Sequence, residues 1–133
     1  MFSKLIICIV FFLLSNFCFS NNNEPIEITA DKMEWNKTKN IAIAIGNARA
    51  VQGNIIITAN KIIANLVNKK TADEIASLNA EGKVEFIGKN QIAKGKKAFY
   101  DLNKDIIILT GDVSLKKQNN IMVGEKLVID FNT

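Results

Sequence analysis

The sequence repeats itself, and the repeat is the feature that most constrains the fold. In each copy a glycine opens an apolar alternation, a small residue follows thirteen positions later, and a lysine comes two positions after that. The copies run from Gly46 to Leu66, from Gly82 to Leu102 and from Gly111 to Phe131, and the lysine half occurs alone from Ala30 to Asn36. A single copy has an apolar face that it cannot bury, so the pattern predicts an array of stacked copies.

The repeated segments have the features of β-strands. Hydrophobic residues make up 48% of the chain, many of them β-branched, and they alternate with polar residues between short polar turns. This pattern predicts an all-β meander of about seven antiparallel strands. The segment from Thr71 to Leu78 contains helix formers but is too short to form a helix alone, so we interpret it as a loop leading into a strand. The strand signals cover residues 26–29, 33–35, 41–46, 55–66, 75–87, 92–102, 106–115 and 121–131.

Two rows of side chains are predicted on opposite faces of these strands. Residues two and six positions after the small residue share one parity, and they are the lysine and an Asn or Asp in every copy, as in Lys97 and Asp101. The opposite parity is apolar, as in Tyr100 and Leu102. Side chains of opposite parity project from opposite faces of a strand. We therefore expect an apolar inner face, with Lys and Asn or Asp on the outer face.

The small residues Ala59, Gly95 and Gly124 mark places where this alternation changes phase. Before Ala59, for instance, Ile55 to Ile57 is apolar on both parities. A small residue at a phase change indicates a bulge or bend. Corners at matching places would curl the sheet into a roll with unsealed ends and edge strands that can pair with another chain.

The first twenty residues differ from the rest and resemble a signal peptide. Lys4 precedes an unbroken apolar run from Leu5 to Leu14, which is too short for an ordinary membrane span of about 20 residues. Cys18 and Ser20 are small residues suited to cleavage after Ser20. We expect residues 1–20 to be a cleavable signal peptide and residues 21–133 to be one domain. An uncleaved N-terminal anchor is the alternative.

Composition argues against an enzyme and against nucleic-acid binding. The chain has no histidine, and both of its cysteines, Cys8 and Cys18, lie in the signal segment. Ser77 and Ser114 have no adjacent base in the sequence. Loss of residues 1–20 lowers the formal net charge from +4 to +3, and the lysines are dispersed, which is typical of a solvated face. We expect no catalysis, no cofactor, no metal and no nucleic-acid partner.

The repeated motifs resemble those of the OstA-like (LptA) family of lipopolysaccharide export proteins. The resemblance covers roughly residues 25–131. It rests on Ile-Thr-Ala-Asp-Lys-Met at 28–33, Gly-Asn-Ala-Arg-Ala at 46–50, Ile-Thr-Ala-Asn-Lys-Ile at 57–62, Leu-Thr-Gly-Asp-Val at 109–113 and Gly-Glu-Lys-Leu at 124–127.

This resemblance implies an open, twisted β-jellyroll in the periplasm that holds the acyl chains of lipopolysaccharide against its inner face. It also implies head-to-tail self-association through edge strands, and LptC-like inner-membrane and LptD-like outer-membrane partners. The family has no sharp binding motif, so only inward-parity positions are carried over as expected lipid contacts. These are Ile62, Leu66, Val84, Phe86, Tyr100, Leu102, Val113, Leu115, Leu127 and Ile129.

Three interpretations remain open at this point. The first is a periplasmic lipid-transfer bridge. The second is a membrane-anchored docking subunit of the LptC type, in which the N-terminal segment is not cleaved. The third is a structural β-repeat adaptor that assembles through its edges and binds no lipid.

Overall fold

A computed structural model describes residues 24–68 and 73–132. These residues form a single antiparallel sheet of eight strands, in the order β1-β3-β4-β5-β6-β7-β8, with β2 also paired to β3. The all-β prediction is confirmed, and the expected signal peptide at residues 1–20 lies outside the described residues. The strands are β1 (Glu27–Thr29), β2 (Lys32–Asn36), β3 (Ile41–Gln52), β4 (Ile55–Asn68), β5 (Asp73–Gly88), β6 (Gln91–Asp101), β7 (Ile106–Lys117) and β8 (Asn120–Asp130).

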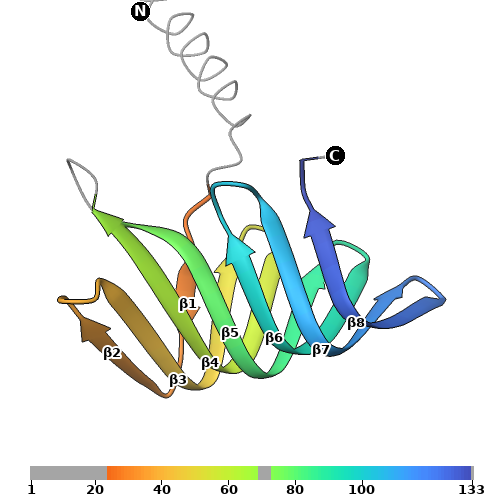
Figure 1. Ribbon diagram of the computed structural model, residues 1–133, viewed down its shortest axis with the longest axis horizontal. Coiled ribbons are helices and arrows are strands. Elements are labelled where there is room, and N and C mark those ends of the chain that lie inside the picture. Colours follow the sequence, from red (N-terminus) through yellow and green to blue (C-terminus); the bar gives the residue numbers. More distant parts are fainter. Residues whose placement is uncertain (1–23, 69–72, 133) are drawn as a thin grey trace, which may run out of the picture.

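The sheet folds over on itself along a corner that crosses every long strand (Figure 1). We call the two parts on either side of this corner the β1 wing and the β2 wing. The β1 wing contains residues 27–29, 48–59, 84–95 and 113–124. The β2 wing contains residues 32–45, 61–68, 73–81, 97–110 and 126–130. Because β1 and β8 are not paired with each other, the sheet is open, as predicted.

Glycine makes the corner possible. Gly46, Gly82 and Gly111 have φ values of 82°, 81° and 84°, and the residue after each of them is also left-handed. Such backbone conformations cost little for glycine because it has no Cβ. Each pair adds one extra residue to β3, β5 or β7 relative to the neighbouring strands, which is a β-bulge.

The small residues that the sequence singles out lie across from these bulges rather than in them. Inward burial shifts phase across two of them: Ile57 and Ala59 are buried in β4, and then Ile62 and Ala64, while in β6 Ala93 is followed by Ala98. The predicted phase change is therefore confirmed, but the extra residue belongs to the neighbouring glycine strand. The small size has a steric reason, because a Cβ on Gly95 would approach within 3.2 Å of the Thr110 carbonyl oxygen.

Both wings contribute to one apolar core. Its largest fully buried side chains come from both sides of the corner, for example Phe86 from the β1 wing and Leu109 from the β2 wing. Among the described residues, Tyr100 is the only buried one whose side chain carries a polar group. The folded sheet thus buries its apolar face against itself, which explains how residues 24–68 and 73–132 form a core without a second sheet or a helix among them.

The outer rows follow the predicted parity. Lys32, Lys61, Lys97 and Lys126 fall in one cross-strand row of the β2 wing. The Asn and Asp row has a more specific role than a solvated face. Asp101 Oδ1 accepts hydrogen bonds from the backbone amides of Asn103 and Lys104, at 3.0 and 3.1 Å. Asn36 and Asp130 cap their own turns in the same way, whereas Asn65 lies inside β4 and donates to Ser77 and Asn79 of β5.

A stability measurement tests the role of the corner glycines. Gly82→Ala places a Cβ at φ +81° and within 2.6 Å of the Asn60 amide nitrogen. We expect the free energy of unfolding in urea to fall by about 1–2 kcal/mol. Gly124→Ala is the matched control, since a Cβ there meets nothing within 4 Å, and it should change stability by less than about 0.5 kcal/mol. Equal effects at the two positions would contradict a special role for Gly82.

Candidate functional site

Nine of the ten residues expected to contact lipid belong to the apolar core or pack against it, and the tenth, Leu66, is partly buried near the end of β4. The ten divide into two groups by accessibility. The first group is buried in the closed interior: Ile62, Val84, Phe86, Tyr100 and Val113. The second group is partly buried: Leu66, Leu102, Leu115, Leu127 and Ile129. Only the second group is accessible to a ligand without movement of the wings.

Accessible apolar surface continues from this second group at the β8 end of the sheet. Met122 pairs with Leu115, so the two side chains share the inner face, and Met122 is 64% exposed. No strand lies beyond β8 among the described residues to cover this end. The inner wall therefore runs from the closed core to open surface along Leu127, Leu115 and Met122.

At the opposite end of the sheet, exposed apolar side chains also continue the inner face. Met33 and Trp35 pair with Ala44 and Ala42, which places both side chains on the inner face, as their parity predicts. They are nevertheless 53% and 62% exposed, because no described strand covers β2 on its other side. The set of expected lipid contacts omitted these two residues. Their parity was the available signal, but their exposure depends on where the sheet ends.

The two wings also meet along a seam opposite the corner. Tyr100, near the end of β6 in the β2 wing, donates a hydrogen bond from its hydroxyl to Gln52 Oε1 in the β1 wing, at 2.7 Å. The Phe131 ring lies 6.0 Å from that of Phe86 and 6.2 Å from that of Tyr100, centroid to centroid. Burial, and secondarily the negative charge of Asp105, raise the pKa of Tyr100 above 10.0. Tyr100 is therefore neutral at physiological pH.

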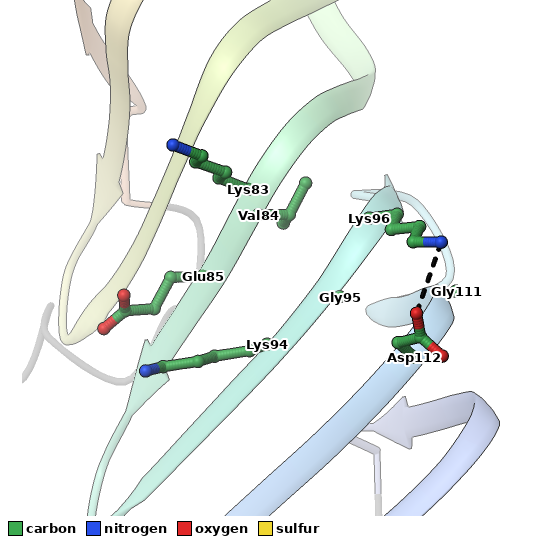
Figure 2. A pocket seen from close by; sticks show the side chains of 8 residues that line it. All are labelled: Lys83, Val84, Glu85, Lys94, Gly95, Lys96, Gly111 and Asp112. Atoms are coloured by element: carbon green, nitrogen blue, oxygen red, sulfur yellow. Dashed lines mark ion pairs between the residues drawn. The ribbon is translucent and has the colours of Figure 1, made fainter.

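A hollow lies on the outside of the corner, and its lining carries charged side chains, unlike the apolar inner face. Figure 2 shows its lining residues between the bulges of β5 and β7 and at Gly95 in β6. Its volume is about 340 Å³. Lys83, Lys94 and Lys96 face it together with Glu85 and Asp112, and Lys96 Nζ lies 3.2 Å from Asp112 Oδ2. This charged, solvated lining does not suit an acyl chain.

The described residues contain no group of His, Cys, Asp and Glu side chains that could hold a metal ion. Within the same residues, no helix is long and apolar enough to span a membrane. The Ser77 hydroxyl accepts a hydrogen bond from Asn65 Nδ2 at 2.9 Å, and Asn65 Nδ2 is also 3.0 Å from Asn79 Oδ1. Ser77 thus has a structural role between β4 and β5.

Comparison with known proteins gives one consistent result. The family described as LptA/(LptD N-terminal domain) LPS transport protein matches residues 27–133. The lipopolysaccharide export system protein LptA of Haemophilus influenzae is 28% identical over 114 residues, which cover 81% of this chain and 66% of that protein. The LPS-assembly protein LptD of Pectobacterium atrosepticum is 36% identical over 97 residues, which cover 71% of this chain and 12% of LptD.

A solved structure supports the fold independently. The crystal structure of LptH from Pseudomonas aeruginosa, described as the LptA homologous periplasmic component of its lipopolysaccharide transport device, superposes with a TM-score of 0.72. The sequence identity is 21%, and the match covers 84% of this chain and 79% of LptH. This likeness is one of fold and confirms the β-jellyroll. The chain spans less than two thirds of the length of the LptA and LptD relatives.

An alkaline titration tests the environment of Tyr100. Because the chain has a single tyrosine, phenolate absorbance reports on this residue directly. We expect its midpoint in the folded protein to lie above 10.0 and above the midpoint in urea. The unfolded chain then loses this proton first, so stability should fall as the pH rises above 10.0, and Tyr100→Phe should lack that part of the decline. Equal midpoints in the folded and unfolded chain would show that Tyr100 is not buried.

Proposed function

The chain belongs to the LptA/LptD N-terminal domain family of LPS transport proteins, and we propose that it is a non-enzymatic periplasmic carrier for lipopolysaccharide. In this proposal the acyl chains lie against the apolar inner face, and the glucosamine-phosphate headgroup stays in water. The observation that carries it is the continuity of this face from the core to exposed residues at both ends of the sheet. Met33 and Trp35 form one end, and Met122 with Ile129 forms part of the other.

The edges of the sheet support the second part of the proposal, which is head-to-tail assembly. Ile121, Met122 and Val123 are consecutive in β8 and are 66%, 64% and 80% exposed. An edge strand with exposed apolar residues and unpaired backbone groups tends to add a strand from another chain. The β2 edge of a second copy, or an LptC-like or LptD-like partner, would complete the sheet and continue the inner wall.

Two alternatives give different results in simple experiments. A membrane-anchored docking subunit of the LptC type would keep the apolar run from Leu5 to Leu14, so N-terminal sequencing of the exported protein separates it from a carrier that begins near Asn21. A structural adaptor without lipid is favoured by the buried state of Phe86 and its neighbours. A fluorescent apolar probe that lipid A displaces would exclude the adaptor.

Neighbouring residues on opposite faces of β8 provide the test of lipid binding. Ile129 is partly buried on the inner face, whereas Val128 is 52% exposed on the outer face. We expect Ile129→Asp to weaken lipid A binding at least about tenfold, because a carboxylate would face the acyl chains. Val128→Asp, with the same charge change, should alter it less than about twofold.

Affinity is measured by displacement of the apolar probe, and circular dichroism checks the fold of each variant. If Ile129→Asp fails to fold, Ile129→Ala removes apolar area at the same place without adding a charge. Equal losses in the inner and outer variants would argue against the inner face as the binding surface.

Self-association is tested at the β8 edge. We expect Val123→Lys to lower the association constant of the purified protein about tenfold or more in analytical ultracentrifugation, because a charge on an edge strand opposes strand addition. Phe99→Lys is the control, since Phe99 is also exposed but lies in the interior strand β6. A wild-type protein that stays monomeric at high concentration would rule out assembly through this edge.

A further inference from the structure

One polar contact crosses the seam where the two wings meet. The Tyr100 hydroxyl donates to Gln52 Oε1 at 2.7 Å, and the two residues are 48 positions apart in the sequence. Tyr100 lies one residue before the end of β6, and Gln52 is the last residue of β3. The other side-chain hydrogen bonds described above join neighbouring strands or close turns within the β2 wing.

Gln52 connects a third part of the chain to this contact. Its amide nitrogen donates to the Glu24 carbonyl oxygen at 2.9 Å, just before β1. Ile26 then packs against the core beside Gln52 and Tyr100. The segment before β1 is therefore held over the seam by the same glutamine that receives the Tyr100 hydrogen bond.

The opposite side of the interior is the glycine corner. Gly46, Gly82 and Gly111 align across β3, β5 and β7, and each sits at a bulge where strand pairing is interrupted. Glycine populates a wide range of backbone dihedrals, so a change in the angle between the wings is absorbed most easily there. The molecule thus has a line of glycine bulges on one side and a small polar contact with aromatic packing on the other.

We propose that the Tyr100–Gln52 hydrogen bond is a clasp that holds the wings closed, and that its release lets acyl chains reach the buried part of the interior. The inference rests on the proposed function and adds the step that controls access. Phe86 and Val84 are 0% and 1% exposed, so they contact a ligand only when the wings separate. The apparent affinity of a ligand that needs the open form falls in proportion to the population of that form.

The strength of the contact suits this role. One neutral hydrogen bond shifts an equilibrium by about fivefold, so it adds to the apolar packing that favours the closed form without locking it. Gln52 is only partly buried, so water can satisfy its amide when the wings part. Tyr100→Phe removes the hydroxyl and keeps the ring that packs against Phe131.

The first measurement follows the wings directly and needs no ligand. Spin labels are placed at Lys89→Cys and Lys104→Cys, which are exposed positions in the β5–β6 and β6–β7 turns, one at the far end of each wing. The full chain is used with Cys8→Ser and Cys18→Ser, so that the labels attach only at these sites. We expect Tyr100→Phe and Gln52→Met each to add longer distances to the distribution.

The control for this measurement is Ser77→Ala, which removes a hydrogen bond of 2.9 Å within the β2 wing. Its distance distribution should match that of the wild type. The proposal is overturned if Tyr100→Phe also leaves the distribution unchanged, or if Ser77→Ala broadens it as much.

The second measurement is the association rate of a fluorescent fatty acid. We expect about a fivefold faster rate and about a fivefold higher affinity in Tyr100→Phe and in Gln52→Met. The double variant should gain little more than either single one, because both remove the same contact. Probe binding with an unchanged rate in both variants overturns the clasp. Longer label distances without probe binding by any variant leave the clasp as a structural contact and overturn the proposed lipid-binding function.

Discussion

The fold depends on burying one apolar face of a single sheet against itself. A flat eight-stranded sheet with this sequence would expose Phe86, Leu109 and the rest of the inner row, at about 1.5–3 kcal/mol for each large side chain. Folding along a corner removes that cost. The corner requires left-handed backbone conformations at aligned positions in alternate strands. The repeated glycine supplies this conformation, so its spacing determines the shape of the whole molecule.

The corner also explains why each glycine strand is followed by a strand with a small residue at the matching place. In an unbulged strand such as β6, a side chain at Gly95 would press on the backbone of β7. At Gly95 the bulge and the small residue are thus two halves of one steric solution, whereas at Gly124, in the edge strand β8, a Cβ would meet nothing within 4 Å. In two of the three copies the Asp six positions after the small residue then ends the strand by capping the next turn, as Asp101 does. Within one repeat, the glycine thus forms the corner, the apolar residues form the inner face, and the Asp closes the turn.

Much of this was predictable from the sequence, because alternation, turns and repeats are local patterns. Strand positions, the inner apolar parity and the phase change at Ala59 all follow from residues close together in the chain. The location of the extra residue at Gly46 and its equivalents was missed, since a phase change identifies a bend without showing which of two paired strands carries the bulge. The exposure of Trp35 and the contact between Tyr100 and Gln52 depend on the ends and the closure of the sheet, and no periodic signal reports these.

Closure and access place opposite demands on the interior. The packing that removes Phe86 from water stabilises the fold, but it also denies that surface to a ligand. The backbone joins the two wings at the corner, so the wings can part most easily at the seam on the opposite side. The conflict between closure and access is therefore concentrated at the seam. A contact there must be weak enough to break on binding and must leave no unsatisfied polar group in either state. The Tyr100–Gln52 bond meets both conditions in the proposed mechanism, since it is a single neutral hydrogen bond and water enters a parted seam to reach both side chains.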